Sequence, residues 1–595
     1  MILDIVPGES SPLQETFYFE LTPRNCALQS TMSEEKSAKA IEKALRQSDN
    51  VWTNKWFAIA MGAMMALFAI SHWISLAYFY YGPRKRYTLI SKYRKARGLL
   101  AGSIMGLRAD RSILYMIYWA VNIVILLTNV DLTNITYVGK RLGWVSLANL
   151  VLLVFLALKN TPLAPLTANS YEKLRPLHKV SGYTCIFVSI LHAVVYLAGW
   201  AQSGSLHKME ERANFAGAIA GMAMLIIGIS TITYFMRGFY ELFYVLHLIM
   251  FILIMITVGM HRPKFSTSTV IIVIITACIW GFDRLVRGAK IFWNFFGNYA
   301  TITALPNGAL RVSLSRKISS SPGSHAFLWV PAIRFVETHP FTLVSSDPPE
   351  FVIRVYDGFT HDLYKAAQQK PGSSLRCSVD GAYGQIPNFK AFEKVILIAG
   401  GSGASFTFAI ALDLIKSSTT AFKSMDFIWV VTDQGCIAWF ASELQKLQSY
   451  HNVKIMIHIT RQSDVSRLIS HGSPVSRSEK DAGHDETNAK GPSLNVTSGD
   501  LEKGAFQQSF SGNEIQLGRP DLDSIIENIV SSSCGLEDNV IIGACGPEDL
   551  MRTTRLAVHN RSLREEGPIT LYTEVSHERN GIFLVLGSLT KRHGG

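Results

Sequence analysis

The sequence contains no pair of cysteines at the short spacing typical of a metal site or a disulfide framework. Its seven cysteines include no CxxC motif, and two of them, Cys185 and Cys278, lie inside apolar segments. This pattern argues against a disulfide-stapled secreted domain and against a cysteine-ligated metal site. The N-terminus lacks the basic start and long apolar core of a signal peptide, so we expect the first spanning segment to direct insertion.

The net charge of +12 is concentrated in one place rather than spread over a nucleic-acid-binding face. Nine basic residues crowd the loop at 82–112 between two apolar segments. The positive-inside rule predicts that this loop is cytoplasmic, and we do not infer nucleic-acid binding from it. The nine residues are Arg84, Lys85, Arg86, Lys92, Arg94, Lys95, Arg97, Arg108 and Arg111.

Long apolar segments dominate the first half of the chain. Hydrophobic residues make up 48% of its 595 residues, which predicts several domains with part of the chain in lipid. After a polar N-terminal tail at 1–50, a seven-helix all-α transmembrane domain is predicted at 51–288, because each apolar window is near the length that crosses about 30 Å of hydrocarbon. The windows are 56–81, 113–130, 142–158, 178–200, 214–235, 240–261 and 270–286.

The second half of the chain is predicted to form two soluble domains. Short strands follow the predicted hairpin turn Asn307-Gly308 and continue to the end of a β-domain at 289–388. The region 389–595 alternates apolar strand-like runs with helical stretches, a pattern typical of a parallel α/β sheet. Within it, residues 462–518 are rich in polar residues and are predicted to be a mostly disordered insertion.

Two apolar segments each carry a pair of histidines fourteen residues apart: His178 with His192, and His247 with His261. That spacing separates the two histidines of a helix by about 21 Å and places them within about 40° of the same face. Imidazole is a favoured axial ligand of haem iron, and ionisable residues inside spans are costly. We therefore predict two stacked bis-histidine haems, His178 with His247 and His192 with His261. A lone membrane histidine can instead serve helix packing, and His72 is interpreted in that way.

Glycine-rich and turn-forming motifs follow strands in the soluble half. In "VILIAGGSGASFTFAIAL" an apolar strand leads through a glycine loop into a helix, an arrangement that lets backbone N–H groups approach a pyrophosphate. "GACGPEDL" ends a later strand, where α/β folds place ligands, although a simple strand-to-turn ending would look the same. "HPFTLVSS" and "YDGFT" are each also compatible with an ordinary strand and turn. The loop residues are Gly400, Gly401, Ser402, Gly403, Ala404 and Ser405.

Taken together, these motifs resemble the ferric reductase and NADPH oxidase superfamily, and within it the fungal ferric-reductase-like transmembrane proteins. The resemblance covers about residues 55–575 without the insertion. Three features look like those of the metalloreductase branch. They are the equal spacing of both histidine pairs, the segment "KNTPLAPLTANSYEKLRPLH" and the segment "RGFYELFYVLH". The resemblance implies haem b, a ferredoxin-reductase-like β-barrel FAD domain at 289–388 and an NADPH-binding α/β domain at 389–595.

The resemblance also implies roles for individual residues. "HPFT" contacts FAD in the family, and the run containing "YDGFT" lies near the flavin diphosphate. The glycine loop corresponds to the NADPH pyrophosphate region, and the Cys-Gly-Pro segment to the nicotinamide region. Arg461 could pair with the ribose 2′-phosphate, or be an ordinary surface arginine. The implied residues are His339, Pro340, Phe341, Thr342, Arg354, Gly358, Thr360, Cys545, Gly546 and Pro547.

Two departures from the family pattern stand out. Ala382 in "DGAYG" replaces a proline, which makes that turn less rigid. Ser576 and His577 occupy the place where family members carry an aromatic residue near the flavin, so the stacking role is unassigned.

The expected function is electron transfer from cytosolic NADPH through FAD and two haems to an acceptor outside the membrane. Three alternatives remain open from the sequence: a metalloreductase acting on extracellular ferric or cupric chelates, an oxidase that reduces oxygen to superoxide, and a catalytically silent membrane protein. The family default predicts the plasma membrane.

Overall fold

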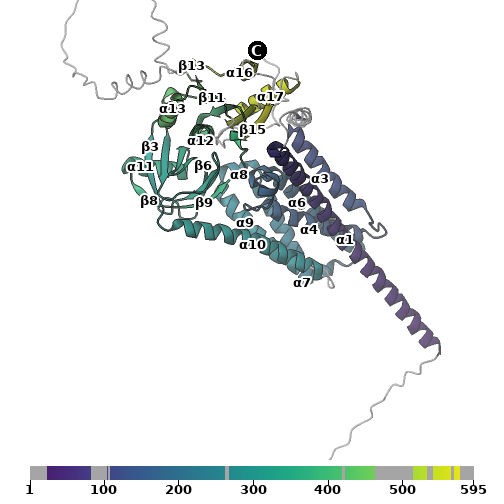
Figure 1. Cartoon of the computed structure of the whole chain (residues 1–595). Helices are drawn as coiled ribbons and strands as arrows, with labels where there is room; N and C mark the ends of the chain where they lie inside the picture. The colour runs from purple at the N-terminus through teal and green to yellow at the C-terminus, as the bar shows by residue number, and fades with distance from the viewer. Residues whose placement is uncertain are drawn as a thin grey trace, which may run out of the picture. The chain divides into compact units, whose positions relative to one another are not determined.

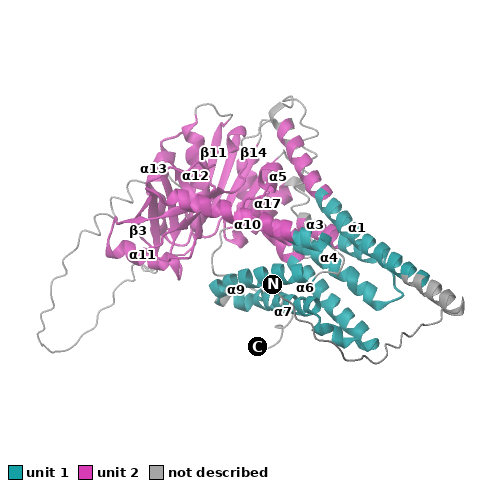
Figure 2. Ribbon diagram, turned by 90° about the horizontal axis from the view of Figure 1, so that it is seen from below, with its two compact units in different colours: residues 1–62, 120–151, 182–273 teal, residues 63–119, 152–181, 274–595 magenta. Residues whose placement is uncertain are grey.

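The computed structural model describes residues 23–81, 103–104, 107–261, 267–417, 422–461, 514–531, 540–563 and 569–575. It divides into two compact units, which Figure 2 colours separately. Unit 1 contains residues 1–62, 120–151 and 182–273, and unit 2 contains residues 63–119, 152–181 and 274–595. Most of the basic loop predicted at 82–112 lies outside the described residues, as do Ser576 and His577.

Six described helices are long and apolar enough to cross a membrane (Figure 1). They are α1 (Pro23–Tyr81), α4 (Ile135–Leu156), α6 (Tyr171–Gln202), α7 (Arg212–Ser230), α9 (Tyr240–Met260) and α10 (Thr267–Phe295). The remaining predicted window, 113–130, coincides with α3 (Ala109–Leu127), whose apolar part is shorter. Residues 23–50 of the predicted polar tail belong to α1. Short elements in this half are β1 (Ser103–Ile104), β2 (Leu107–Arg108), α5 (Leu163–Thr167) and α8 (Thr233–Gly238).

The helices bury small residues where they meet and expose large apolar ones. In α7, Ala216, Ala220 and Ala223 are buried, which lets neighbouring α9 approach closely. Large side chains such as Phe187 and Ile256 are exposed. A lipid bilayer would cover such a surface.

The first soluble domain is a seven-stranded antiparallel sheet in the order β8-β3-β4-β7-β6-β5-β9. The hairpin predicted at Asn307-Gly308 is confirmed: both residues have positive φ, 54° and 67°, as a tight turn between β3 and β4 requires. The strands are β3 (Tyr299–Leu305), β4 (Ala309–Leu314), β5 (His325–Trp329), β6 (His339–Ser346), β7 (Pro349–Arg354), β8 (Ser374–Arg376) and β9 (Ser378–Tyr383), with helix α11 (Phe359–Gln369).

The second soluble domain is a six-stranded parallel sheet in the order β13-β12-β11-β10-β14-β15, as the alternating pattern predicts. Its strands are β10 (Lys394–Gly400), β11 (Ser424–Val431), β12 (Val453–Ile459), β13 (Glu514–Leu517), β14 (Val540–Gly546) and β15 (Ile569–Val575). Its helices are α12 (Ala404–Lys416), α13 (Ala441–Gln448), α16 (Leu522–Ser531) and α17 (Glu548–Leu563).

The insertion predicted to be mostly disordered, 462–518, contains a short strand at its C-terminal end. Residues 514–517 form β13, which pairs in parallel with β12 at the edge of the sheet. Pairing with β12 gives the backbone N–H and C=O groups of β13 hydrogen-bond partners, and this does not depend on the composition of the segment. The polar composition of the region therefore did not reveal the strand. Residues 462–513 lie outside the described part of the chain.

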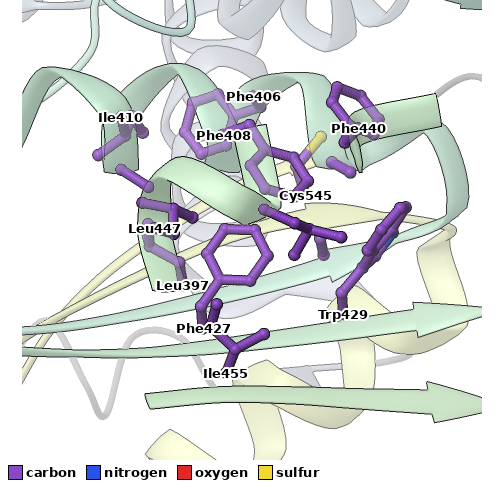
Figure 3. Packing of buried hydrophobic residues seen from close by; sticks show 14 of the residues in the cluster. Leu397, Phe406, Phe408, Ile410, Phe427, Trp429, Phe440, Leu447, Ile455 and Cys545 are labelled. Carbon is purple, nitrogen blue, oxygen red and sulfur yellow. The ribbon is translucent and has the colours of Figure 1, made fainter. Parts of the chain in front are cut away.

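Aromatic side chains fill the core between this sheet and α12 (Figure 3). Phe408 stacks on Phe440 with 4.5 Å between ring centroids, and the edge of Trp429 meets Phe408 at 5.6 Å. The indole Nε1 of Trp429 also donates a hydrogen bond of 3.1 Å to the carbonyl of Gly401. The core therefore holds the glycine loop in place directly.

Candidate functional site

Three of the four predicted haem ligands lie on two helices, and the fourth directly follows one of them. His178 and His192 belong to α6, and His247 belongs to α9. His261 follows the last residue of α9, and its backbone N–H donates to the carbonyl of Thr257 at 2.8 Å. His178 is part of unit 2 and the other three are part of unit 1.

Within unit 1, the rings of His192 and His261 lie close together, with 6.0 Å between centroids and 72° between their planes. Two imidazoles on opposite sides of one iron need a similar separation, since a metal–nitrogen bond is about 2 Å and the nitrogen lies about 1 Å from the ring centre. The Nδ1–H of each ring donates 2.7 Å to a backbone carbonyl, that of Gly139 for His192 and that of Ala213 for His261. This bond fixes the tautomer that leaves Nε2 unprotonated, with its lone pair available.

Glycines make room for both rings. A Cβ on Gly143 of α4 would lie 2.9 Å from the His192 ring, and a Cβ on Gly217 of α7 would lie 2.5 Å from that of His261. Any larger residue would displace the imidazoles, because carbon atoms in contact stay roughly 3.5 Å apart or more. The residues present at this position therefore fit a bis-histidine haem.

Helices α4 and α6 are joined by side-chain hydrogen bonds at a seven-residue repeat. On α6, His178, Cys185 and His192 donate to carbonyls of α4 at 3.1, 3.5 and 2.7 Å. The accepting residues, Leu153, Ser146 and Gly139, are also seven apart. Seven residues are about two helical turns, so the three side chains share one face of α6.

His247 differs from the other three histidines. Its Nδ1 is buried and has no hydrogen-bond partner among the described residues. Its ring centroid lies 5.5 Å from that of Phe243, one turn earlier on α9. The sequence spacing, which is the same for both pairs, gave no sign of this asymmetry.

The two motifs predicted to contact FAD meet in the structure. The His339 ring, at the start of β6, stacks on Phe359 at the start of α11, with 4.4 Å between centroids and 18° between planes. The Phe341 ring lies 6.3 Å from the same phenylalanine. Thr342 and Pro340 pair across the sheet with His325 and Phe327 of β5, so they share a face with those residues.

The residues predicted to lie near the flavin diphosphate are found where β7 leads into α11. Arg354 ends β7, with its guanidinium 5.5 Å from the Tyr356 ring centroid. Gly358, at φ +88°, precedes α11, and the Thr360 hydroxyl donates 2.6 Å to the Tyr356 carbonyl. The N-terminus of α11 thus presents backbone N–H groups beside an arginine, an arrangement suited to a diphosphate.

The two nucleotide-binding motifs are also in contact. They follow β10 and β14, the neighbouring strands at which the strand order of the sheet reverses. In such sheets, ligands bind in the crevice at the carboxyl ends of the strands. A Cβ on Gly403 would overlap the carbonyl of Cys545, and one on Gly400 would lie 2.7 Å from Pro547. The glycines let the two loops close together, and Gly401, at φ +54°, supplies the turn.

The remaining nucleotide-site residues differ in exposure. Ser405 is buried, and its hydroxyl donates 3.2 Å to the Val352 carbonyl, so its side chain holds two domains together. Arg461 is exposed just beyond β12, where its backbone N–H donates to the carbonyl of Thr432.

Burial, with the Glu574 carboxylate, raises the pKa of the Cys545 thiol. Ser402 is partly exposed in the loop, while Ala404 and Gly546 are buried.

A polar cluster that the sequence did not predict lies on the same face as Thr342 and Pro340. His325 Nε2 lies 2.7 Å from Glu172 Oε1 and 3.3 Å from the Tyr171 hydroxyl. Lys159 Nζ lies 3.3 Å from the Phe327 ring centroid. These residues come from segments more than 150 positions apart, so no local spacing could have indicated the cluster.

Helix α10 is fixed to strand β9 by a buried ion pair and two further hydrogen bonds. Asp380, which is fully buried, accepts 2.7 Å from Arg287 Nε and 2.6 Å from the Tyr383 hydroxyl. Asn294 donates to the Val379 carbonyl at 2.8 Å, and Ser378 donates to the Ile291 carbonyl at 2.5 Å.

Known families match consecutive parts of the chain in the same order as these features. Residues 142–258 match the ferric reductase like transmembrane component, residues 295–387 an FAD-binding domain, and residues 392–559 the ferric reductase NAD binding domain. In all three parts, the chain is similar to ferric reductases. The match to the transmembrane component contains His178, His192 and His247.

This ferric reductase-like protein has many curated fungal relatives. It is 26% identical over 384 residues to "Ferric/cupric reductase transmembrane component 2" of Schizosaccharomyces pombe, covering 54% of this chain and 66% of that protein. It is 24% identical over 432 residues to "Probable ferric reductase transmembrane component" of Candida albicans, covering 71% and 62%. With "Probable cell surface ferric reductase kap2" of Aspergillus oryzae the identity is 26% over 337 residues, covering 51% and 45%. The chain spans less than two thirds of the length of these relatives.

Proposed function

We propose that this chain is an NADPH-dependent metalloreductase that carries electrons across a membrane to ferric or cupric chelates. The observation that carries the proposal is the pair His192 and His261, with ring centroids 6.0 Å apart and both tautomers fixed by backbone carbonyls. This pair lies on apolar helices of a chain that continues into FAD-binding and NAD-binding domains. The names of the fungal relatives favour metal chelates as acceptors.

The proposed cofactors are FAD, two haems b and NADPH, and each has its own set of residues. His178 with His247 and His192 with His261 would hold the irons. When bound, the flavin exchanges a hydride for single electrons and the haems pass those electrons on. Two histidines on each haem iron would leave it no open coordination position. The acceptor would therefore receive electrons without binding to a haem iron.

The soluble residues orient the two nucleotides. His339, Pro340, Phe341 and Thr342 would bind the flavin, and Arg354, Gly358 and Thr360 its diphosphate. The loop at 400–405 would receive the NADPH pyrophosphate against residues 545–547, and Arg461 would select the 2′-phosphate. Trp429 would hold this loop in its binding shape through the hydrogen bond to Gly401.

We further propose seven spans, with α3 as the seventh, in the plasma membrane. The basic loop at 82–112 would then lie in the cytosol, and so would the FAD and NADPH domains. Electrons would move outward. A membrane potential negative inside would assist this movement by about 2.3 kcal/mol per electron per 100 mV for full crossing.

An anaerobic absorbance spectrum of the detergent-purified protein tests the proposal. We expect a low-spin b-type haem signal that NADPH reduces as completely as dithionite does. Haems that dithionite reduces but NADPH does not would refute electron transfer from NADPH, and a protein without haem would refute the whole route.

A second assay compares the acceptors in proteoliposomes. We expect NADPH consumption that depends on ferric or cupric chelates. Consumption that depends on oxygen alone, with superoxide formation, would identify an oxidase with the same cofactors.

A further inference from the structure

Glu172 and His325 form a close pair within unit 2. Glu172 lies in the first turn of α6, and His325 begins β5. The His325 Nε2 to Glu172 Oε1 distance is 2.7 Å, and the Tyr171 hydroxyl lies 3.3 Å from the same nitrogen. Both carboxylate oxygens of Glu172 are buried without a well-aligned hydrogen bond, so the contact with His325 is an ion-pair contact, and 31% of the Glu172 side chain remains exposed.

The pair lies between a proposed flavin contact and a proposed haem ligand. His325 pairs across the sheet with Thr342, and directly opposed residues have Cβ atoms about 5 Å apart on one face. Glu172 lies six residues before His178 on α6, about 9 Å along the helix axis. An electron passing from flavin to the first iron would therefore pass close to this pair.

The surrounding groups form a charged and aromatic shell. Burial, with the charge of Arg287, lowers the pKa of Lys159 to about 7, so this lysine exchanges protons near neutral pH. The titratable and charged groups that face the pair come from the segment before α6, from α6 itself, and from α10, β9 and β15. They are Lys159, Tyr171, Arg175, Arg287, Asp380, Tyr383 and Tyr572.

We propose that Glu172 and His325 accept a proton from the reduced flavin as its electrons leave for the haem. The proposal rests on the proposed function. NADPH would give bound FAD a hydride and water would supply one proton, so the reduced flavin would hold two electrons and two protons. Two ferric irons then take the electrons singly, which leaves two protons to be removed.

The pair would take one of these protons in a balanced step. A flavin N–H bond would break, the electron would reduce iron(III) to iron(II), and the proton would pass to the His325 imidazole, beside the balancing negative charge of the Glu172 carboxylate. The proton then returns to cytosolic water. The second proton leaves with the second electron by the same route after the pair has been deprotonated again.

Anaerobic stopped-flow absorbance of the full-length protein separates the two steps. The variants are Glu172→Gln and His325→Gln, and the matched control is Asp413→Asn, a carboxylate in the NAD-binding domain that lies 2.9 Å from Lys390. We expect NADPH to reduce the flavin at an unchanged rate in all three variants. In the first two variants, haem reduction should slow by at least about tenfold. Loss of a proton-transfer group typically slows a reaction by about 100-fold or more. The solvent deuterium isotope effect on haem reduction should persist or increase, because proton removal then limits the rate.

Three results would overturn the inference. Normal haem reduction in both variants would show that the pair moves no proton. Slower reduction without a solvent isotope effect would reveal a positioning role only, as would loss of bound FAD or haem from both variants. Where one variant loses its cofactors, the other decides. Wild-type haems that NADPH never reduces would refute the proposed function itself, a result distinct from the others.

Discussion

Replacing Gly217 by alanine tests the site of His261 with a single methyl group. The new Cβ would lie 2.5 Å from Nδ1 and 2.6 Å from Cε1 of the His261 ring. It would enter the space beside the 2.7 Å hydrogen bond from that Nδ1 to Ala213, one turn earlier on α7. The ring must therefore move by roughly 1 Å to reach ordinary contact.

The cost has two parts. Losing the hydrogen bond removes about 1 kcal/mol, and overpacking a well-packed site costs roughly 1–3 kcal/mol. Loss of the partner that orients a metal-binding histidine typically lowers metal affinity by about 10- to 100-fold. We therefore expect Gly217→Ala to lose one of the two haems while keeping the other.

The assay is the haem-to-protein ratio of the purified protein, together with its low-temperature electron paramagnetic resonance spectrum. We expect one low-spin ferric signal in Gly217→Ala and two in the wild type. Gly221→Ala is the matched control, because a Cβ at Gly221, one turn further along α7, has no atom within 4 Å. Two unchanged haem signals in Gly217→Ala would refute the assignment of His261 as a ligand held from α7.

Three further substitutions test other parts of the structure. Gly403→Ala should weaken NADPH binding, measured by titration, because its Cβ overlaps the Cys545 carbonyl; unchanged affinity would contradict the proposed loop. Asp380→Asn should lower stability by about 3–5 kcal/mol in thermal unfolding, since it leaves Arg287 without its buried partner; an unchanged midpoint would contradict a buried pair. Lys159→Met should flatten the pH dependence of stability, measured as unfolding midpoints at pH 7, 8 and 9. Because the folded pKa of Lys159 is about 7 against an ordinary 10.5, the unfolded chain holds more protons between these values, and wild-type stability should rise with pH there.

Local patterns in the sequence predict much of the fold. The turn at Asn307-Gly308 and the strand leading into Gly400 depend on neighbouring residues, so their chemistry is visible in a short window. The spacing of His192 and His261 from their partners likewise predicts two rings at one level, and the centroids of those two rings lie 6.0 Å apart.

Features made by distant segments could not be predicted in this way. The pair of Glu172 and His325 depends on how α6 and β5 meet, and each residue alone looks like an ordinary polar side chain. Strand β13 follows a long polar segment, so its composition resembles that of the insertion before it. The short apolar part of α3 appeared as a full window because hydropathy does not show where a helix ends.

The seven-residue repeat joining α4 to α6 limits how this pair of helices can change during evolution. Inserting one residue into either helix would rotate everything beyond it by about 100° and separate the remaining donors from their carbonyls. Only changes of seven residues, about 10.5 Å, would keep the helices in register. The distance between the histidine levels is therefore inherited as a whole number of repeats. Length variation among homologues should collect in the connections on either side, where no such register has to be kept.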